Sequence, residues 1–272
     1  PYYRDKAKNW NKKLKIMKEG GIKVVSFSIP WRHHSLLEQN QKTQKFDFLG
    51  NSLKNRNLNK FLNLISELDL YACVKIGPFN RNHVNFGGLP DFVSPDINSN
   101  IQPFRNHLIL KGLPKRSINR WPQIKGKALP SPFDSIFLSY LEKYFHSLSK
   151  EILKEHFYPN GPIILTQISD NGYFSTAHWG IFYMGDYSYK NINKFRSFLH
   201  KKYKTISNYN TINASNYDTF PDIYPPDLFE GNKNYNNLQD MHKIIDWGEF
   251  CIDNYCDWLN ILKKFIAIKK KI

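Results

Sequence analysis

The segment GPIILTQISDNGYF, residues 161–174, places polar side chains directly after a short apolar run. Such a run is typical of a buried strand, and Gln167, Ser169, Asp170 and Asn171 stand at its end. In barrel enzymes, catalytic groups gather at the carboxyl ends of strands. No Glu appears in this cluster, so the segment could be an active site, an altered active site or only a strand that ends in a turn. The same Asp-Asn-Gly letters are also typical of an ordinary turn.

Two other predicted strands also end near polar or aromatic candidates. The segment IKVVSFSIPW, residues 22–31, leads to His34, and LYACVKIGPF, residues 70–79, leads to His83. An imidazole could hydrogen-bond a ligand hydroxyl, although a solvated loop histidine is an equal alternative for His83. Trp31 could be a platform for a sugar ring, but a core position is favoured because tryptophan is highly buried on average.

Helical segments separate these strands. Apolar residues recur at helical spacing in 5–19, 57–68, 133–157, 190–203 and 240–266. Strands that alternate with helices indicate a parallel α/β fold. No glycine-rich phosphate loop follows any strand, which argues against a nucleotide-binding doubly wound sheet. Aromatic and polar strand ends instead favour a (β/α)8 barrel that binds a sugar, formed as a single domain over residues 1–272.

Two stretches lack this periodicity. Residues 94–132 contain many prolines and basic residues, and residues 204–235 are rich in Asn, Tyr and Pro. We predict that both are long loops, which are often functional in compact domains.

Composition narrows the classes of partner. The net charge of +16 would suit nucleic acid, but no basic stripe is interleaved with aromatic residues, so we expect no nucleic-acid partner. The sequence contains no run of about 18 apolar residues, so we predict no membrane span and no membrane partner. Cys73, Cys251 and Cys256 suit neither a disulfide framework nor a zinc site and are predicted to be reduced, mostly buried thiols. No metal site or cofactor is expected.

One further carboxylate pair stands in the last helical segment. Glu249 and Asp253 are four residues apart and would share one helix face. A solvated helix face is favoured there over a catalytic pair.

Four blocks of the sequence resemble family 35 of the glycoside hydrolases, the β-galactosidase family. They occur in the family's order and together span about residues 1–175. They are YYRDKAKNWNKKLKIMKEGGIKVVSFSIPWRHH (2–34), FDFLGN with LNKFLNLISELDLYACVKIGPF (46–51 and 58–79), NFGGLPDFV (85–93) and GPIILTQIS (161–169). The resemblance implies a partial (β/α)8 barrel comprising about strands two to six, truncated at both ends.

The resemblance also assigns roles at the end of the strand 162–168. Alignment on Gln167 puts Ser169 at the first Glu of the family's Q-x-E-N-E motif and Asp170 at its Asn. Asn171 then stands at the catalytic acid/base Glu. Asn has no ionisable proton and cannot act as a general acid. Asp170 would substitute only if the loop shifted by one residue.

The other family positions are partly altered. His83 stands where the family has a sugar-contacting Glu, and Arg32 stands where it has an Asn, whereas Trp31 and His34 are retained. Trp31, His34, His83, Gln167 and Ser169 are therefore the candidate substrate-binding residues.

The resemblance implies a retaining hydrolase of O-glycosidic bonds with a β-galactoside-like substrate. Such enzymes need two carboxyl groups, and no segment of this sequence matches the family's nucleophile strand. The alternative is a non-catalytic carbohydrate-binding protein or gene fragment. Missing strands would leave open sheet edges, so we expect association into an oligomer or with a complementing chain.

Overall fold

The computed structural model describes residues 1–36, 44–79, 85–94, 100–103, 129–169, 186–226 and 238–266. The chain divides into two compact units, which are described separately below. Unit 1 contains Pro1–Val93, Leu138–Phe174 and Leu259–Ile272, and unit 2 contains Ser94–Phe137 and Ser175–Trp258. The single domain that we expect over the whole chain stays a prediction.

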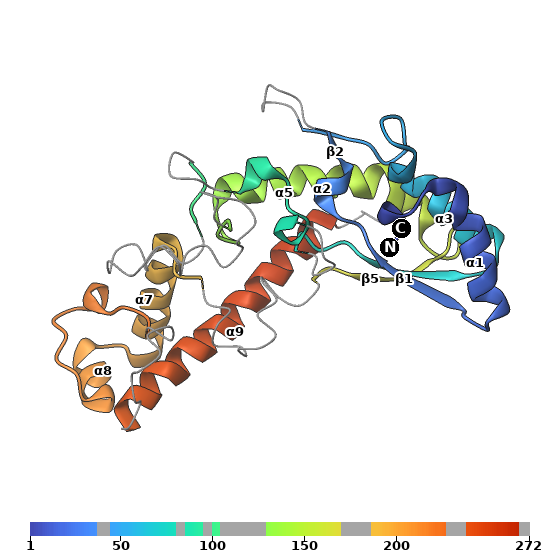
Figure 1. The fold of residues 1–272 in the computed structure, drawn as a ribbon. Helices are drawn as coiled ribbons and strands as arrows, with labels where there is room; N and C mark the ends of the chain where they lie inside the picture. The colour runs from blue at the N-terminus through green and yellow to red at the C-terminus, as the bar shows by residue number, and fades with distance from the viewer. Residues whose placement is uncertain are drawn as a thin grey trace. The chain divides into compact units, whose positions relative to one another are not determined.

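A parallel three-stranded sheet forms the centre of unit 1 (Figure 1). Its strands are β1 (Val24–Ser28), β4 (Tyr71–Lys75) and β5 (Ile163–Gln167), in the spatial order β1-β4-β5. All three lie where the apolar runs predict them, and all three are parallel, which confirms the predicted α/β class. With the helices between the strands, this is part of a (β/α)8 barrel.

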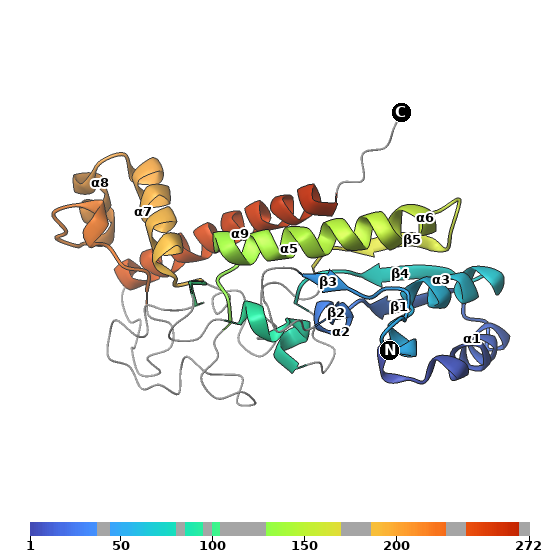
Figure 2. The same ribbon diagram turned by 90° about the horizontal axis from the view of Figure 1, so that it is seen from above.

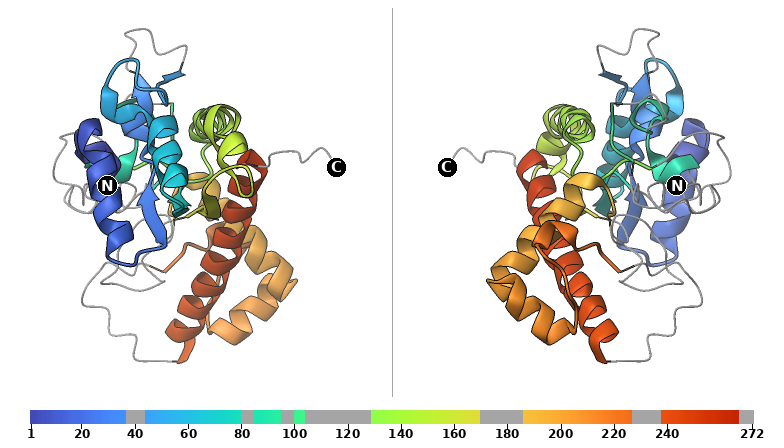
Figure 3. Two further views of the ribbon diagram at one scale, coloured as in Figure 1. Left: turned by 90° about the vertical axis from the view of Figure 1, so that its right-hand side faces the viewer. Right: turned by 90° about the vertical axis from the view of Figure 1, so that its left-hand side faces the viewer.

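Three helical segments accompany this sheet. They are α1 (Trp10–Glu19), α3 (Leu58–Glu67) and α5 (Ser135–Leu148), and α5 continues through a π-helical turn (Ser149–Leu153) into α6 (Lys154–His156). The helices α1 and α3 contact each other and lie side by side (Figure 3). Figure 2 shows α5 continuing into α6, which precedes β5 in the chain. Each helix lies within a predicted helical segment.

The two faces of the sheet differ in burial. Successive side chains of a strand point to opposite faces, and in β4 the side chains of Ala72 and Val74 are fully buried. On the other face, Val24 pairs with Tyr71 and their side chains are 44% and 42% exposed, while Leu165 of β5 is 58% exposed. In a closed barrel, this second face would point into the packed barrel interior.

Unit 2 is built from α7 (Tyr189–Tyr203), α8 (Ile206–Asn213) and the part of α9 (Leu238–Ile266) that ends at Trp258 (Figure 1). Tyr187, Phe195, Leu199, Trp247 and Phe250 are among the buried side chains of its core.

Helix α8 corrects the prediction of a continuous loop over 204–235. Thr205 caps the helix by accepting a hydrogen bond from the backbone N–H of Asn208, and Ala214 ends it in a left-handed conformation with φ of 41°. Buried Tyr209 packs its ring against Tyr203 with centroids 5.1 Å apart. Local capping and one aromatic anchor therefore form a helix that the Asn-rich composition conceals.

The described ends of the 94–132 segment meet in unit 2. Pro103 and Pro130 form an isolated antiparallel bridge, and the backbone N–H of Ser131 donates to the carbonyl of Gln102 at 2.9 Å. Most of this segment lies outside the described residues.

The prediction that the three cysteine thiols are mostly buried is wrong for two of them, because Cys251 is buried whereas Cys73 is half-buried and Cys256 is exposed. Across the described residues, none of the helices combines the length and apolar character needed to cross a bilayer.

Candidate active site

The carboxyl ends of the three strands meet at one edge of the sheet in unit 1. Ser28 pairs with Lys75, and Lys75 pairs with Gln167. The backbone ladder continues one residue further, because Ile29 N–H donates to Lys75 O at 2.9 Å and Ile76 N–H donates to Gln167 O at 3.0 Å. The segments that follow the three strands therefore start from the same level of the sheet.

Gly77 brings two of these segments into close contact. A Cβ atom at this position would lie 2.9 Å from the carbonyl oxygen of Ile168 and 3.1 Å from the Cα of Ser169. Only glycine fits there without displacing the backbone that follows β5. Gly77 of the Gly-Pro-Phe sequence after β4 thus allows the backbone of Ile168 and Ser169 to pass close by.

Gln167 and Ser169, two predicted substrate-binding residues, lie at this edge. Both side chains are half-buried, and the Gln167 side-chain amide donates to the Ser169 carbonyl at 2.8 Å. This bond links the Gln167 side chain to the backbone just after the strand end.

Trp31 is a core side chain in the structure. It is fully buried and stacks on Tyr144 of α5, with ring centroids 5.2 Å apart and an angle of 14° between the planes. The Tyr144 hydroxyl donates to the carbonyl of Ile29 at 3.0 Å. The geometry thus supports the core interpretation of Trp31 over a sugar platform.

His34, in the short helix α2 (Trp31–His34), is fully buried and uses both ring nitrogens within unit 1. Nδ1 lies 2.7 Å from the Asp47 carbonyl, and Nε2 lies 2.5 Å from the Tyr2 hydroxyl. A carbonyl only accepts, so Nδ1 carries the proton and Nε2 accepts from Tyr2. Burial lowers the pKa of His34 to about 3, so the ring is neutral. This geometry indicates that His34 positions the surrounding backbone, because both ring nitrogens are bonded to protein atoms and neither is left to contact a sugar.

The two middle residues of α2 also hold other segments. Arg32 makes a bidentate ion pair with Asp91, both N–O distances being 2.8 Å, and its guanidinium also donates to the Leu89 carbonyl at 3.0 Å. His33 Nε2 donates to the Asn55 carbonyl at 3.1 Å, and burial lowers the pKa of His33. Arg32 therefore ties the Gly-Gly-Leu-Pro loop to the end of β1.

Asp47 organises the segment that joins the short strand β3 (Lys45–Phe46) to helix α3. Strand β3 pairs with the short strand β2 (Ser35–Leu36). The Asp47 carboxylate accepts backbone N–H bonds from residues 49–52 and a hydrogen bond from the Ser52 hydroxyl. Burial alone would raise the pKa of Asp47, but the bonds from Ser52 and its neighbours hold it well below its usual value. Sequence reasoning gave neither Asp47 nor Arg32 a role; an Asp placed three residues before Gly50 in a turn-like segment is the one signal for Asp47.

The remaining predicted site residues lie outside the described part of the chain. Asp170 and Asn171, the catalytic candidates, and His83 are among them. The predicted convergence of His34, His83 and Asn171 at one end of the sheet therefore stays a prediction.

Within the ranges that the structure describes, no three His, Cys, Asp or Glu side chains are grouped closely enough to hold a metal ion.

Comparisons with known proteins find one matching family model and several curated relatives. Residues 1–105 match the sequence model of glycosyl hydrolases family 35. A β-1,2-glucosyltransferase of Ignavibacterium album is 28% identical over 267 residues, which is 97% of this chain and 33% of that protein. An exo-β-D-glucosaminidase of Pyrococcus horikoshii is 25% identical over 92% of this chain and 29% of its own length. Rice β-galactosidase 11 is 33% identical over 39% of this chain and 12% of its own length.

Solved structures share the fold. The β-galactosidase of Marinomonas ef1 superposes with a TM-score of 0.55 at 14% identity, covering 96% of this chain and 34% of that one. The β-amylase catalytic domain of Paenibacillus polymyxa gives a TM-score of 0.58 at 16% identity, covering 96% and 59% respectively. The chain spans a third or less of the length of the glucosyltransferase, the glucosaminidase and the rice β-galactosidase named above.

Proposed function

Because the chain carries a domain of the glycoside hydrolase family 35 type, we propose that it forms the sugar-facing part of a site for β-linked O-glycosides. The site lies at the carboxyl edge of β1, β4 and β5. One observation carries the proposal: the paired ends at Ser28, Lys75 and Gln167 start three family-like segments from one level of the sheet. In barrel enzymes this edge holds the active site.

The proposal divides the candidate residues into two groups. Gln167 and Ser169 face the sugar and hydrogen-bond its hydroxyls, and His83 contributes from the neighbouring loop. Trp31 and His34 position the backbone that carries the site, because both are buried in contacts with the protein.

We further propose that residues 1–272 bind a β-galactoside-like sugar without hydrolysing it. Retaining hydrolysis needs two carboxyl groups about 5–5.5 Å apart, and Asn171 at the acid/base position has no proton to donate. Asp170 is shorter than Glu by one methylene, and small displacements of a reacting group are costly.

Binding tests the location of the site. Methyl β-D-galactoside is titrated into the purified chain, with folding checked by circular dichroism, and amide shifts are followed by NMR. We expect saturable binding with a Kd of roughly 1–10 mM, weakened about tenfold by Gln167→Ala. The control Thr166→Ala changes the neighbouring residue of β5, whose side chain points to the opposite face, and should leave binding within about twofold. Equal effects of the two variants would place the sugar elsewhere.

A second candidate is glycosyl transfer to a sugar hydroxyl in place of water. It is motivated by the Ignavibacterium album β-1,2-glucosyltransferase, whose match extends over 97% of this chain at 28% identity, beside the Pyrococcus horikoshii exo-β-D-glucosaminidase at 92% and 25%. An aryl β-glucoside donor is incubated with the chain, with and without glucose as acceptor, and the products are analysed by mass spectrometry. A disaccharide that forms only with acceptor would favour transfer.

A further inference from the structure

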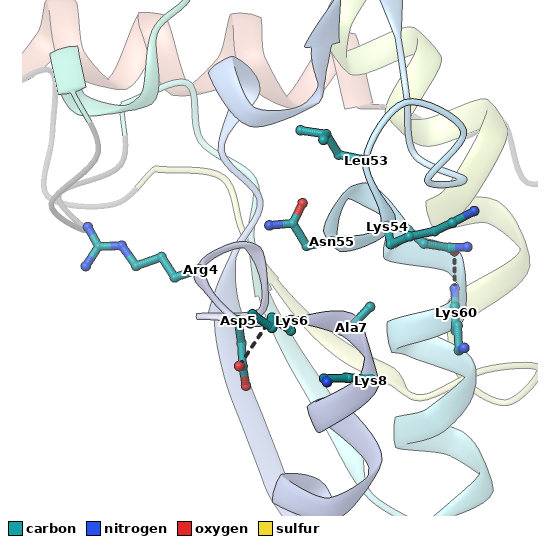
Figure 4. Close-up of a pocket in the computed structure, with 10 residues that line it drawn as sticks. Arg4, Asp5, Lys6, Ala7, Lys8, Leu53, Lys54, Asn55 and Lys60 are labelled. Atoms are coloured by element: carbon teal, nitrogen blue, oxygen red, sulfur yellow. Dashed lines mark hydrogen bonds between the residues drawn. The ribbon is translucent and has the colours of Figure 1, made fainter.

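Unit 1 contains a pocket of about 720 Å³ between the turn that precedes α1 and the segment that leads into α3 (Figure 4). Figure 4 shows Lys6, Ala7 and Lys8 on one side and Leu53, Asn55 and Lys60 on the other. The volume lies within the range of about 300–1,000 Å³ that is usual for small-molecule sites. Both segments belong to the described residues, and neither contributes a candidate residue to the carboxyl-edge site.

The lining of this pocket is strongly cationic. Lys6, Lys8, Lys54 and Lys60 line it together with Arg4, whose side chain extends away from the others in Figure 4. Within the described ranges, the four lysine side chains form no ion pair with another described residue. Several like charges gathered around one concave surface raise the local concentration of anions.

The one carboxylate in the lining is already neutralised. Asp5 pairs with the Lys13 ammonium at 2.6 Å and accepts from the Asn9 side chain at 3.1 Å. It also accepts from the backbone N–H of Lys6 at 2.9 Å. The hydrogen bond from Lys13, followed by that from Asn9, lowers the pKa of Asp5. Asp5 therefore stays ionised with its own cation outside the lining and does not offset the four lysines.

The rest of the lining suits more than a bare ion. Ala7 and Leu53 provide apolar surface, and the Leu53 side chain is 52% exposed. Asn55 and Asn57 add amide groups. Asn55 is held in place because its side-chain N–H donates to the Tyr3 carbonyl at 2.8 Å. Apolar and amide surface beside cations is the mixture that recognises a polar ring bearing a charged group.

We propose that this pocket binds a sugar-sized molecule that carries a phosphate or sulfate group. Lysine ammonium groups act as point charges for such oxyanions, the asparagine amides hydrogen-bond ring hydroxyls, and Ala7 and Leu53 contact the apolar face of the ring. The inference goes beyond the carboxyl-edge site, because it concerns other residues and is measured by binding alone.

Isothermal titration calorimetry of the 272-residue chain tests the proposal. The probes are glucose 6-phosphate, glucose 6-sulfate, inorganic phosphate and glucose. We expect the two charged sugars to bind more tightly than phosphate and more tightly than glucose. The double variant Lys54→Gln/Lys60→Gln should weaken charged-sugar binding about fivefold to tenfold. The matched control Lys12→Gln/Lys15→Gln removes the same charge from exposed positions of α1 and should change it less than about twofold.

Three results would overturn the proposal. The first is that neither charged sugar binds the wild-type chain. The second is an equal loss in the pocket variant and the α1 control, which would indicate a general effect of net charge. The third is that inorganic phosphate binds as tightly as glucose 6-phosphate, which would leave the asparagines and the apolar wall without a role. Tighter binding of either charged sugar than of phosphate and glucose supports the proposal, and the stronger of the two shows which oxyanion the pocket holds better.

Discussion

The short helix α2 and the end of β5 both stand at the carboxyl edge of the sheet, and both carry residues that the sequence marks as sugar-binding. They differ in how the protein uses them. In α2, Trp31 stacks on Tyr144, Arg32 pairs with Asp91, and both nitrogens of His34 bond to protein atoms. At the end of β5, Gln167 and Ser169 are only half-buried.

The difference shows that the sequence blocks at the carboxyl edge contain both residues that build the protein core and residues that remain partly exposed. The Trp-Arg-His-His turn joins β1 to four other parts of unit 1, so its residues build the edge. At the end of β5, the polar residues Gln167 and Ser169 lie at that edge and stay partly exposed. Substitutions in α2 should therefore change stability first, whereas those in β5 should change binding first.

The largest effect is expected for Trp31→Ala. Removing a fully buried aromatic side chain should lower the free energy of unfolding by about 3–5 kcal/mol, measured by urea denaturation. This is a large share of the total stability of a domain, so the variant is also examined for folding by circular dichroism. A decrease in the free energy of unfolding of less than about 1 kcal/mol would contradict the core role of Trp31 and favour the alternative that its ring contacts a sugar.

A pH dependence is expected from His34. Its folded pKa of about 3 lies below the ordinary 6.5, so the neutral ring stabilises the fold above about pH 6.5. This contribution is lost as the pH falls towards 3, by about 2 kcal/mol between about pH 7.5 and pH 5. Denaturation of the wild type and His34→Gln at each pH isolates it from other histidines. The exposed control His146→Gln should keep the wild-type slope; an unchanged slope in His34→Gln would refute the buried neutral ring.

The Arg32–Asp91 pair should have a smaller effect. The two side chains are 28% and 39% exposed, so solvent screens part of the interaction. A double-mutant cycle with Arg32→Gln and Asp91→Asn should give a coupling of about 1 kcal/mol in the free energy of unfolding. A coupling of zero would mean that Arg32 does not hold the loop that contains Leu89.

The smallest change in stability is expected for Gln167→Ala. Its side chain is half-buried and makes one hydrogen bond to a backbone carbonyl, so unfolding should shift by only about 0.5 kcal/mol. Sugar binding should nevertheless weaken, as described for the titration with methyl β-D-galactoside. A large loss of stability would place Gln167 with α2 and remove the contrast between the two segments.

Much of this frame follows from the sequence because the signals are local. The three strands are continuous apolar runs, and α3 and α7 carry regular helical spacing, so their types and places are predictable. Helix α8 is missed because a cap at Thr205 and the ring contact between Tyr209 and Tyr203 decide it, and neither is visible in the periodicity.

Other features are missed because they join distant segments. Arg32 meets Asp91 across 59 positions of the chain, and the pocket joins the turn at Lys6 to the turn at Lys54. His34 shows the reverse case. Its place after a strand suggests a ligand contact, but Tyr2 and the Asp47 carbonyl occupy both ring nitrogens.

The most direct test of the central claim, that residues 1–272 hold a sugar-facing edge without a general acid, is an assay of nitrophenol release. The folded chain is incubated with an aryl β-galactoside from mildly acidic to mildly basic pH, where a tuned carboxyl group would titrate. We predict release no faster than in buffer. Clear turnover that disappears in Asp170→Ala would contradict the claim and identify Asp170 as the acid. Turnover that survives in Asp170→Ala would contradict it as well and place the catalytic site elsewhere in the chain.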